Sequence, residues 1–138
     1  MLSQTIIIII LTTLLSFSAF SNRKLYSDLI LYPPAINRGQ YYRFLTSGFI
    51  HADLQHLLFN MLTLYFFGRA IEGLLTMYVG KWAFLTLYLG AIIISDIPSY
   101  MKNRHNAHYA SLGASGGVSA IAFAFIIFAP WAWFAFPP

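Results

Sequence analysis

The sequence predicts an all-α protein, a polytopic bundle of membrane-spanning helices, from two observations. Of its 138 residues, 59% are hydrophobic and 9% are charged, whereas a soluble globular domain has about 25% charged residues. The hydrophobic residues also gather in four long runs that approach the roughly 20 residues needed to cross a bilayer core. The chain contains no cysteine, so a disulfide framework and a thiolate metal site are excluded.

The four predicted membrane spans cover Leu2 to Phe20, Leu54 to Leu75, Trp82 to Ile97 and Gly116 to Phe136. The first run has no Lys or Arg ahead of Ile6 and lacks a small-residue cleavage site, so we interpret it as a membrane helix and not as a signal peptide. The last run contains Pro130, which removes a helix hydrogen bond. We therefore expect that helix to break or kink near Ala129.

Two polar segments connect these runs. Residues Ser21 to Ile50 mix tyrosines and arginines with Pro33-Pro34, a composition that favours a folded structure in the headgroup zone over a flexible tether. Residues Asn103 to Ser111 lead into a glycine cluster. No polybasic run is present, so no nucleic-acid partner is expected. We treat residues 1–138 as a single transmembrane domain.

The order of the spans places three polar side chains at one membrane face. The second and fourth predicted helices run in the same direction, so both begin at the same face. His56 and Asn60 lie four residues apart on one side of the second helix, and Ser115 stands at the start of the fourth. We therefore expect these three groups to converge. His51 would point about 140° away from His56 on a continuous helix, which suggests a different role.

Two interpretations of these residues stay open at this point. His56 and Asn60 can simply hydrogen-bond between helices, at about 1 kcal/mol per contact, and Ser115 can be a small residue in a packing stripe with Gly113 and Gly117. However, polar groups inside membranes are costly and indicate function by default. The glycines would permit a tight turn, and a helix start offers unpaired amides to a developing oxyanion.

Several motifs in combination resemble the rhomboid intramembrane serine proteases. In order they are Tyr42-Arg43, His51, His56 with Asn60, Gly68-Arg69-Ala70-Ile71-Glu72, and Gly113-Ala114-Ser115-Gly116. The resemblance covers roughly Leu2 to Phe128. It implies a rhomboid-like bundle with about four of the family's six core helices. The implied function is intramembrane serine endopeptidase activity, which hydrolyses peptide bonds in or near transmembrane segments of substrate proteins.

The resemblance also assigns roles to particular residues. Ser115 corresponds to the family nucleophile. His56 and Asn60 match the side chains that stabilise the oxyanion, together with the backbone N–H groups of Ser115 and Ala114. Gly113 matches the glycine that lets the backbone turn before the nucleophile. Oxyanion donors of this kind are typically worth about 3 to 4 kcal/mol each.

Further matches and departures complete the resemblance. Arg43 and Glu72 match residues that hold the interfacial loop in shape. Ser119 stands where some members have a tyrosine that stacks on the catalytic imidazole. That imidazole belongs to a histidine on the family's sixth helix, and no histidine follows Ser115 here. His105 and His108 lie in a polar loop at the same face, but we expect both to be solvated and not to act as the base.

The predicted identity is therefore a truncated rhomboid that does not cleave by itself, because a serine of this type needs an adjacent base. The alternative is a non-catalytic rhomboid-like membrane protein that binds client transmembrane helices, and a plain structural membrane subunit is a third possibility. No cofactor is expected. No metal is expected either, because the pair His105 and His108 lacks an acidic partner at ligand spacing.

The expected location is the plasma membrane of a bacterium, with transmembrane protein substrates and the lipid bilayer as partners. Membrane orientation has two conflicting indicators. The family pattern places the N-terminus in the cytoplasm. The loops after the first and third spans carry six Lys or Arg residues, against Arg69 and Lys81 on the other side, so the positive-inside rule favours the reverse orientation. We follow the family pattern, because Arg43 then has a structural role.

Overall fold

The structure is a computed structural model that describes residues 2–129. Its elements are α1 (Gln4–Ser21), α2 (Arg23–Leu29), α3 (Pro33–Asn37), α4 (Arg43–Thr46), the 3-10 helix η1 (Ser47–Phe49), α5 (Leu54–Tyr78), α6 (Ala83–Asn103) and α7 (Ser115–Phe128). In this part of the chain the extended pairing is limited to one isolated bridge between Leu31 and Ser111. The predicted all-α fold is confirmed. Pro130 and the rest of the fourth predicted span lie outside the described residues.

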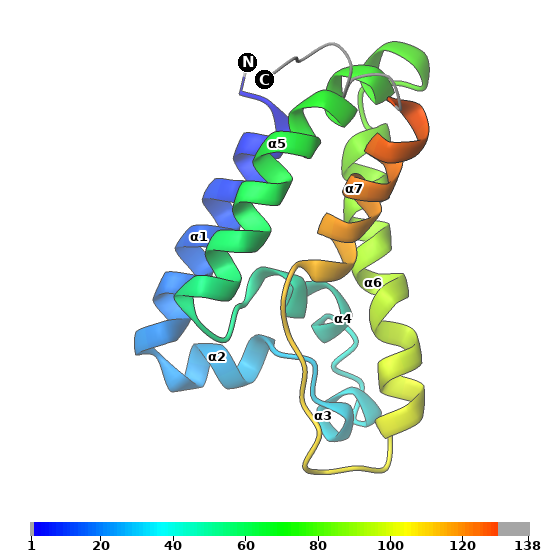
Figure 1. Cartoon of the computed structure of the whole chain (residues 1–138). Coiled ribbons are helices and arrows are strands. Elements are labelled where there is room, and N and C mark those ends of the chain that lie inside the picture. Colours follow the sequence, from blue (N-terminus) through cyan, green and yellow to red (C-terminus); the bar gives the residue numbers. More distant parts are fainter. Residues whose placement is uncertain (1, 130–138) are drawn as a thin grey trace.

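Four long helices alternate in direction and form the bundle (Figure 1). α5 and α7 both begin at the end of the bundle where α2, α3 and α4 lie. α7 packs against both α5 and α6, and α1 packs against α5. The prediction that the second and fourth spans start at one face is therefore confirmed.

α1 has its small and polar residues on the inside. Its buried residues are Thr5, Ile8, Thr12, Ser16 and Ala19, which recur every three or four positions and so share one face. A Cβ atom added to Gly68 of α5 would lie 2.8 Å from Cγ2 of Thr5. Small residues of this kind let two membrane helices approach closely.

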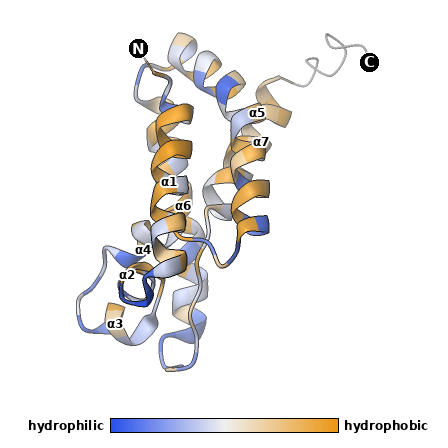
Figure 2. Ribbon diagram, turned by 90° about the vertical axis from the view of Figure 1, so that its left-hand side faces the viewer, coloured by the Kyte–Doolittle hydropathy of each residue, from blue (hydrophilic) through white to orange (hydrophobic). Residues whose placement is uncertain are grey.

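The outer surface of the bundle is apolar. Large exposed side chains include Leu14 and Phe17 on α1, Phe66 on α5, Ile94 on α6 and Ile127 on α7. Figure 2 shows that hydrophobic residues run along α1 and α7 and that hydrophilic residues gather at the two ends of the bundle. A soluble protein rarely exposes such a continuous apolar surface, whereas lipid tails would cover it.

Two described helices, α1 and α6, are long and apolar enough to cross a membrane by length and composition. α5 has 25 residues, or about 37 Å at 1.5 Å per residue, but it carries Arg69 and Glu72. α7 has 14 residues, belongs to the shorter apolar helices and ends at Phe128 with Ala129 as its C-cap, so the expected end of the helix near Ala129 is confirmed. All four predicted spans therefore correspond to helices, with α5 the most polar.

The segment between α1 and α5 is folded, as predicted, because it contains α2, α3, α4 and η1. Arg43 organises it from a buried position. Its Nη1 donates to the carbonyl oxygens of Ser27 and Ile30 at 2.7 and 2.9 Å, and its Nε donates to Oε1 of Gln40 at 2.8 Å. The predicted loop-holding role of Arg43 is confirmed.

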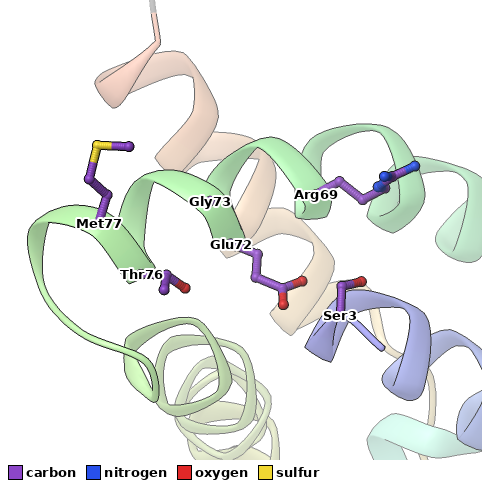
Figure 3. Close-up of a pocket in the computed structure, with 6 residues that line it drawn as sticks. All are labelled: Ser3, Arg69, Glu72, Gly73, Thr76 and Met77. Carbon is purple, nitrogen blue, oxygen red and sulfur yellow. The ribbon is translucent and has the colours of Figure 1, made fainter. Parts of the chain in front are cut away.

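Glu72 has a different role from the predicted one. It lies 18 residues after the start of α5, about 27 Å along the helix and away from the interfacial loop. Its carboxylate accepts hydrogen bonds from the backbone N–H groups of Gln4 and Thr5 at 2.6 and 2.9 Å, and from Oγ1 of Thr5 at 2.7 Å. Figure 3 shows Glu72 turned toward the first turn of α1, near Ser3, and Arg69 pointing elsewhere. Glu72 fixes α1 to α5.

Candidate active site

The site begins at the turn that starts α5. Oδ1 of Asp53 accepts the backbone N–H of His56 at 2.7 Å, which caps the helix so that its first residue is Leu54. His51 therefore precedes the helix, and the prediction that it points about 140° away from His56 is wrong. Their rings instead lie edge to face, with centroids 5.1 Å apart.

The backbone before Ser115 makes a tight turn at Gly113. Gly113 has φ +114°, a conformation that L side chains rarely adopt. A Cβ atom there would also lie 2.9 Å from Cε1 of His56. The N–H of Gly113 donates to the carbonyl oxygen of Ser47 at 2.9 Å. Glycine is therefore required for two reasons, the backbone conformation and the close approach of the His56 ring.

His51 links this turn to α1. The hydroxyl of Ser16 donates to the carbonyl oxygen of Phe49 at 3.0 Å, so it accepts from Nδ1–H of His51, also at 3.0 Å. Nε2 of His51 then accepts the N–H of Ala114 at 3.3 Å. This pattern requires the neutral imidazole with its proton on Nδ1. Burial lowers the pKa of His51 to about 4, and the charge of His56 contributes in the same direction.

Two backbone N–H groups were expected to face the oxyanion, and one of them is occupied. The Ala114 N–H donates to His51 at 3.3 Å, so in this structure it does not face an open oxyanion site. Ser115 is the first residue of α7, and Ala114 before it provides no side-chain cap. Among the described residues the Ser115 N–H has no backbone partner. A helix start with an open N–H attracts negative charge.

Ser115, His56 and Asn60 come from the starts of the two helices that pack side by side. Ser115 is exposed, and His56 lies against Gly113, two residues before it. Asn60 is buried on α5, and its Nδ2 donates to the carbonyl oxygen of His56 at 2.9 Å. An amide nitrogen carries two protons, so one donor of Asn60 is left. Among the described residues, no hydrogen bond joins Ser115 directly to His56 or Asn60.

No histidine of the described residues contacts the Ser115 hydroxyl through a hydrogen bond. His105 and His108 are exposed in the loop between α6 and α7, and neither they nor His51 nor His56 forms a hydrogen bond with the Ser115 hydroxyl in residues 2–129. Within the same residues, no group of three or more His, Cys, Asp or Glu side chains could hold a metal ion.

A pocket of about 480 Å³ opens beside Ser115 between α6 and α7. Asp96 of α6 lines it, a residue that sequence analysis missed. The indication was available in the sequence, because Asp96 is the one carboxylate within the apolar run Trp82–Ile97. An ionisable residue in a membrane span indicates function by default.

Fold and site together define a helical membrane protein that presents a serine at a helix start. A family model described as the Rhomboid domain matches residues 38–138. The chain belongs to the rhomboid family.

Individual relatives agree with this assignment. The rhomboid-family protein YdcA of Bacillus subtilis (strain 168) is 34% identical over 87 residues, which are 63% of this chain and 41% of YdcA. Rhomboid protease GluP of the same organism is 39% identical over 83 residues, 60% of this chain and 15% of GluP. The human mitochondrial presenilin-associated rhomboid-like protein is 36% identical over 78 residues, 56% of this chain and 20% of that protein. The matches thus span less than half the length of each relative.

Proposed function

We propose that this chain provides the nucleophile and the oxyanion site of a rhomboid-type intramembrane serine endopeptidase. The observation that carries the proposal is the turn at Gly113, which places Ser115 at the start of α7 with an open N–H and sets His56 directly against the turn. The substrates would be transmembrane proteins. The membrane would be a bacterial plasma membrane, as two relatives come from Bacillus subtilis.

In this proposal the Ser115 hydroxyl attacks the scissile carbonyl while a base takes its proton. The negative oxygen of the tetrahedral intermediate accepts hydrogen bonds from the Ser115 N–H, the His56 ring and the second amide proton of Asn60. Collapse of the intermediate releases the amine, which takes the proton from the base and leaves an acyl-enzyme on Ser115. Water then hydrolyses this ester. Each oxyanion donor would contribute about 3 to 4 kcal/mol to the transition state.

We further propose that a polypeptide of residues 1–138 does not cleave by itself. Support comes from the four histidines, none of which forms a hydrogen bond with Ser115 in the described structure. Without a base the serine hydroxyl stays protonated at neutral pH. A fluorophosphonate probe should therefore label the purified chain no faster than its Ser115→Ala variant. Serine-dependent labelling together with turnover of a model transmembrane substrate would contradict this statement.

The catalytic assignment needs a complete catalytic unit, so it is tested on the chain expressed with any residues encoded in frame after Pro138. Ser115→Ala should abolish cleavage of a transmembrane substrate, and Asn60→Ala should lower kcat by about 100-fold or more. Ser18→Ala removes an exposed hydroxyl of α1 and His105→Ala an exposed loop imidazole. Both controls should retain activity. Cleavage that survives Ser115→Ala would exclude the proposed nucleophile.

The second candidate is a non-catalytic rhomboid-like protein that binds client transmembrane helices. The two candidates differ in their dependence on Ser115. Client capture in cross-linking experiments that is unchanged in the Ser115→Ala variant, with no processing of the client by the unmodified protein, would favour the binding protein.

A further inference from the structure

The end of α6 is tied to α3 at the end of the bundle that holds α2, α3 and α4 (Figure 1). Nδ2 of Asn37 donates to the carbonyl oxygen of Arg104 at 2.8 Å, and the Tyr100 hydroxyl donates to Oδ1 of Asn37 at 2.6 Å. The Phe44 ring packs edge to face on Tyr100, with centroids 5.3 Å apart. Arg38, the C-cap residue of α3, follows Asn37 directly. The fold therefore brings two arginines, Arg38 and Arg104, to one corner of the molecule.

The protein does not neutralise the positive charge of this corner. No Asp or Glu occurs in residues 29–52 or in residues 97–138. Arg38 and Arg104 are exposed, and among the described residues neither guanidinium group forms a hydrogen bond or an ion pair. Arg43, the third arginine of these segments, is buried and donates to backbone carbonyl oxygens. Two guanidinium groups at this corner are thus free to bind an anion from outside the chain.

An exposed apolar face of α6 leads to the same corner. Ile93, Ile97, Met101 and Arg104 follow one another at intervals of four, four and three residues, so they share one side of the helix. The first three side chains are exposed. Arg104 is the C-cap residue of α6 and keeps helical backbone angles, with φ −61° and ψ −19°. This side of α6 is therefore apolar for about 16 Å and ends in a cation.

The combination favours one class of ligand. Guanidinium groups bind phosphate oxygens through paired N–H donors. A soluble phosphate would use these donors and leave the apolar face of α6 without a role. An anionic phospholipid would use both parts, because its phosphate lies in the headgroup zone while its acyl chains lie along the apolar surface of a membrane helix. Basic residues next to a membrane span attract anionic lipids in this way.

We propose that the corner formed by α3 and the end of α6 binds an anionic phospholipid. Arg38 and Arg104 would hold the phosphate, and Ile97 and Met101 would contact an acyl chain. A bound lipid would bridge α3 and α6 and so strengthen the contact that Asn37 makes between them. The proposal goes beyond the proposed function and is independent of it, because no residue of the site takes part in the chemistry at the serine.

A role in lipid binding would also explain the excess of cations at this end of the bundle. Arg38 and Arg104 are two of the six Lys or Arg residues for which the positive-inside rule favours the reverse of the family orientation. Arg43 is a third, and its partners lie within the interfacial segment. Three of the six cations would then have a specific partner, in the lipid or in the protein.

Lipid binding tests the proposal directly. The purified chain in micelles of a neutral detergent is titrated with phosphatidylglycerol and with phosphatidylcholine that carry the same fluorescent acyl chain. Phosphatidylglycerol should bind about 30-fold tighter, which corresponds to about 1 kcal/mol from each of two cations. Arg38→Gln and Arg104→Gln should each reduce this preference to about fivefold, and the double variant to less than about twofold. The control Arg23→Gln removes the same charge from an exposed position on α2 and should keep the full preference.

Each contrary result overturns a different part of the proposal. Equal affinities of the two lipids for the unmodified chain would exclude a specific anionic site, and this comparison needs no variant to fold. Equal losses of preference in Arg23→Gln and Arg104→Gln would show that the preference follows net charge and not this corner. Displacement of the lipid by about a tenfold excess of inorganic phosphate would exclude the phospholipid as the occupant. None of these results depends on Ser115, so the proposed function is tested separately.

Discussion

The two ends of α5 hold polar groups in contrasting states. At the far end, Glu72 accepts three hydrogen bonds from the first turn of α1. Near the start of α5, the His56 ring has no hydrogen-bond partner among the described residues, and Asn60 uses one of its two amide protons. The Ser115 N–H, at the start of the neighbouring α7, has no partner there either. A saturated group inside a bundle stabilises the fold, whereas a group with unused donors is available to a ligand or a transition state.

A polar residue close to Ser115 can still have all of its hydrogen-bonding groups occupied. His51 lies edge to face with His56, yet both of its ring nitrogens are occupied, by Ser16 and by Ala114. His51 therefore resembles Glu72 more than its neighbour. Its hydrogen bonds are structural, although they position the turn that carries the nucleophile.

The largest expected effect comes from Glu72→Ala. The change leaves two backbone N–H groups and one hydroxyl of α1 without their acceptor, and each hydrogen bond to a charged group is worth about 1.5 kcal/mol or more. We expect a loss of roughly 4 kcal/mol in the free energy of unfolding, measured by denaturant titration in mixed micelles. The exposed Asp28→Ala variant is the control and should lose far less. Equal losses in both variants would show that saturation of Glu72 has no structural importance.

The second effect is a dependence of stability on pH through His51. Its pKa is about 4 in the folded protein and about 6.5 when unfolded, so below pH 6.5 the unfolded chain binds the extra proton. The stabilisation is complete above pH 6.5 and disappears as the pH falls toward 4, a change of about 3 kcal/mol. The unmodified protein should lose that much more than His51→Gln between pH 7 and pH 4. His105→Gln, in an exposed loop, should follow the unmodified protein. Identical slopes for all three would rule out the buried neutral imidazole.

Gly113→Ala should have the third largest effect on the free energy of unfolding. Compared with Gly39→Ala, it separates the cost of the backbone conformation from the cost of the contact with the His56 ring. Gly39, at φ +98°, has open space around it, whereas a Cβ on Gly113 would overlap the His56 ring at 2.9 Å. An L residue in this backbone region costs about 1 to 2 kcal/mol. Gly39→Ala should therefore lose about that amount and keep the proposed activity. Gly113→Ala should lose more and should also displace His56, which the chemical shifts of the imidazole would report. A His56 signal that does not move would contradict the close approach.

The sequence was sufficient for the positions of the helices and for the convergence of α5 and α7, because apolar runs and the parity of crossings depend on local composition. It was not sufficient for the partners of individual polar groups. Glu72 was assigned to the interfacial loop, although it lies toward the other end of α5. The predicted direction of His51 was wrong because Asp53 caps the start of α5, so His51 lies before the helix. Asp96 was missed although it is the one carboxylate in the apolar run Trp82–Ile97. Its partner Ser47 could not be predicted, because Ser47 lies far from Asp96 in sequence and is brought beside it only by folding.

The smallest expected effect compares two serines of similar chemistry. Ser16 is buried, donates to Phe49 and accepts from His51, so Ser16→Ala leaves a carbonyl oxygen and an imidazole N–H unpaired, at a cost of about 1 to 3 kcal/mol. Ser115 is exposed and has no side-chain hydrogen bond among the described residues, so Ser115→Ala should leave the free energy of unfolding unchanged within about 0.5 kcal/mol. Denaturant titrations of both variants measure the difference. If Ser115→Ala destabilises the protein as much as Ser16→Ala, then the Ser115 hydroxyl makes structural hydrogen bonds. It would then not be a group that is available to a substrate, and the proposed contrast with Ser16 would be wrong.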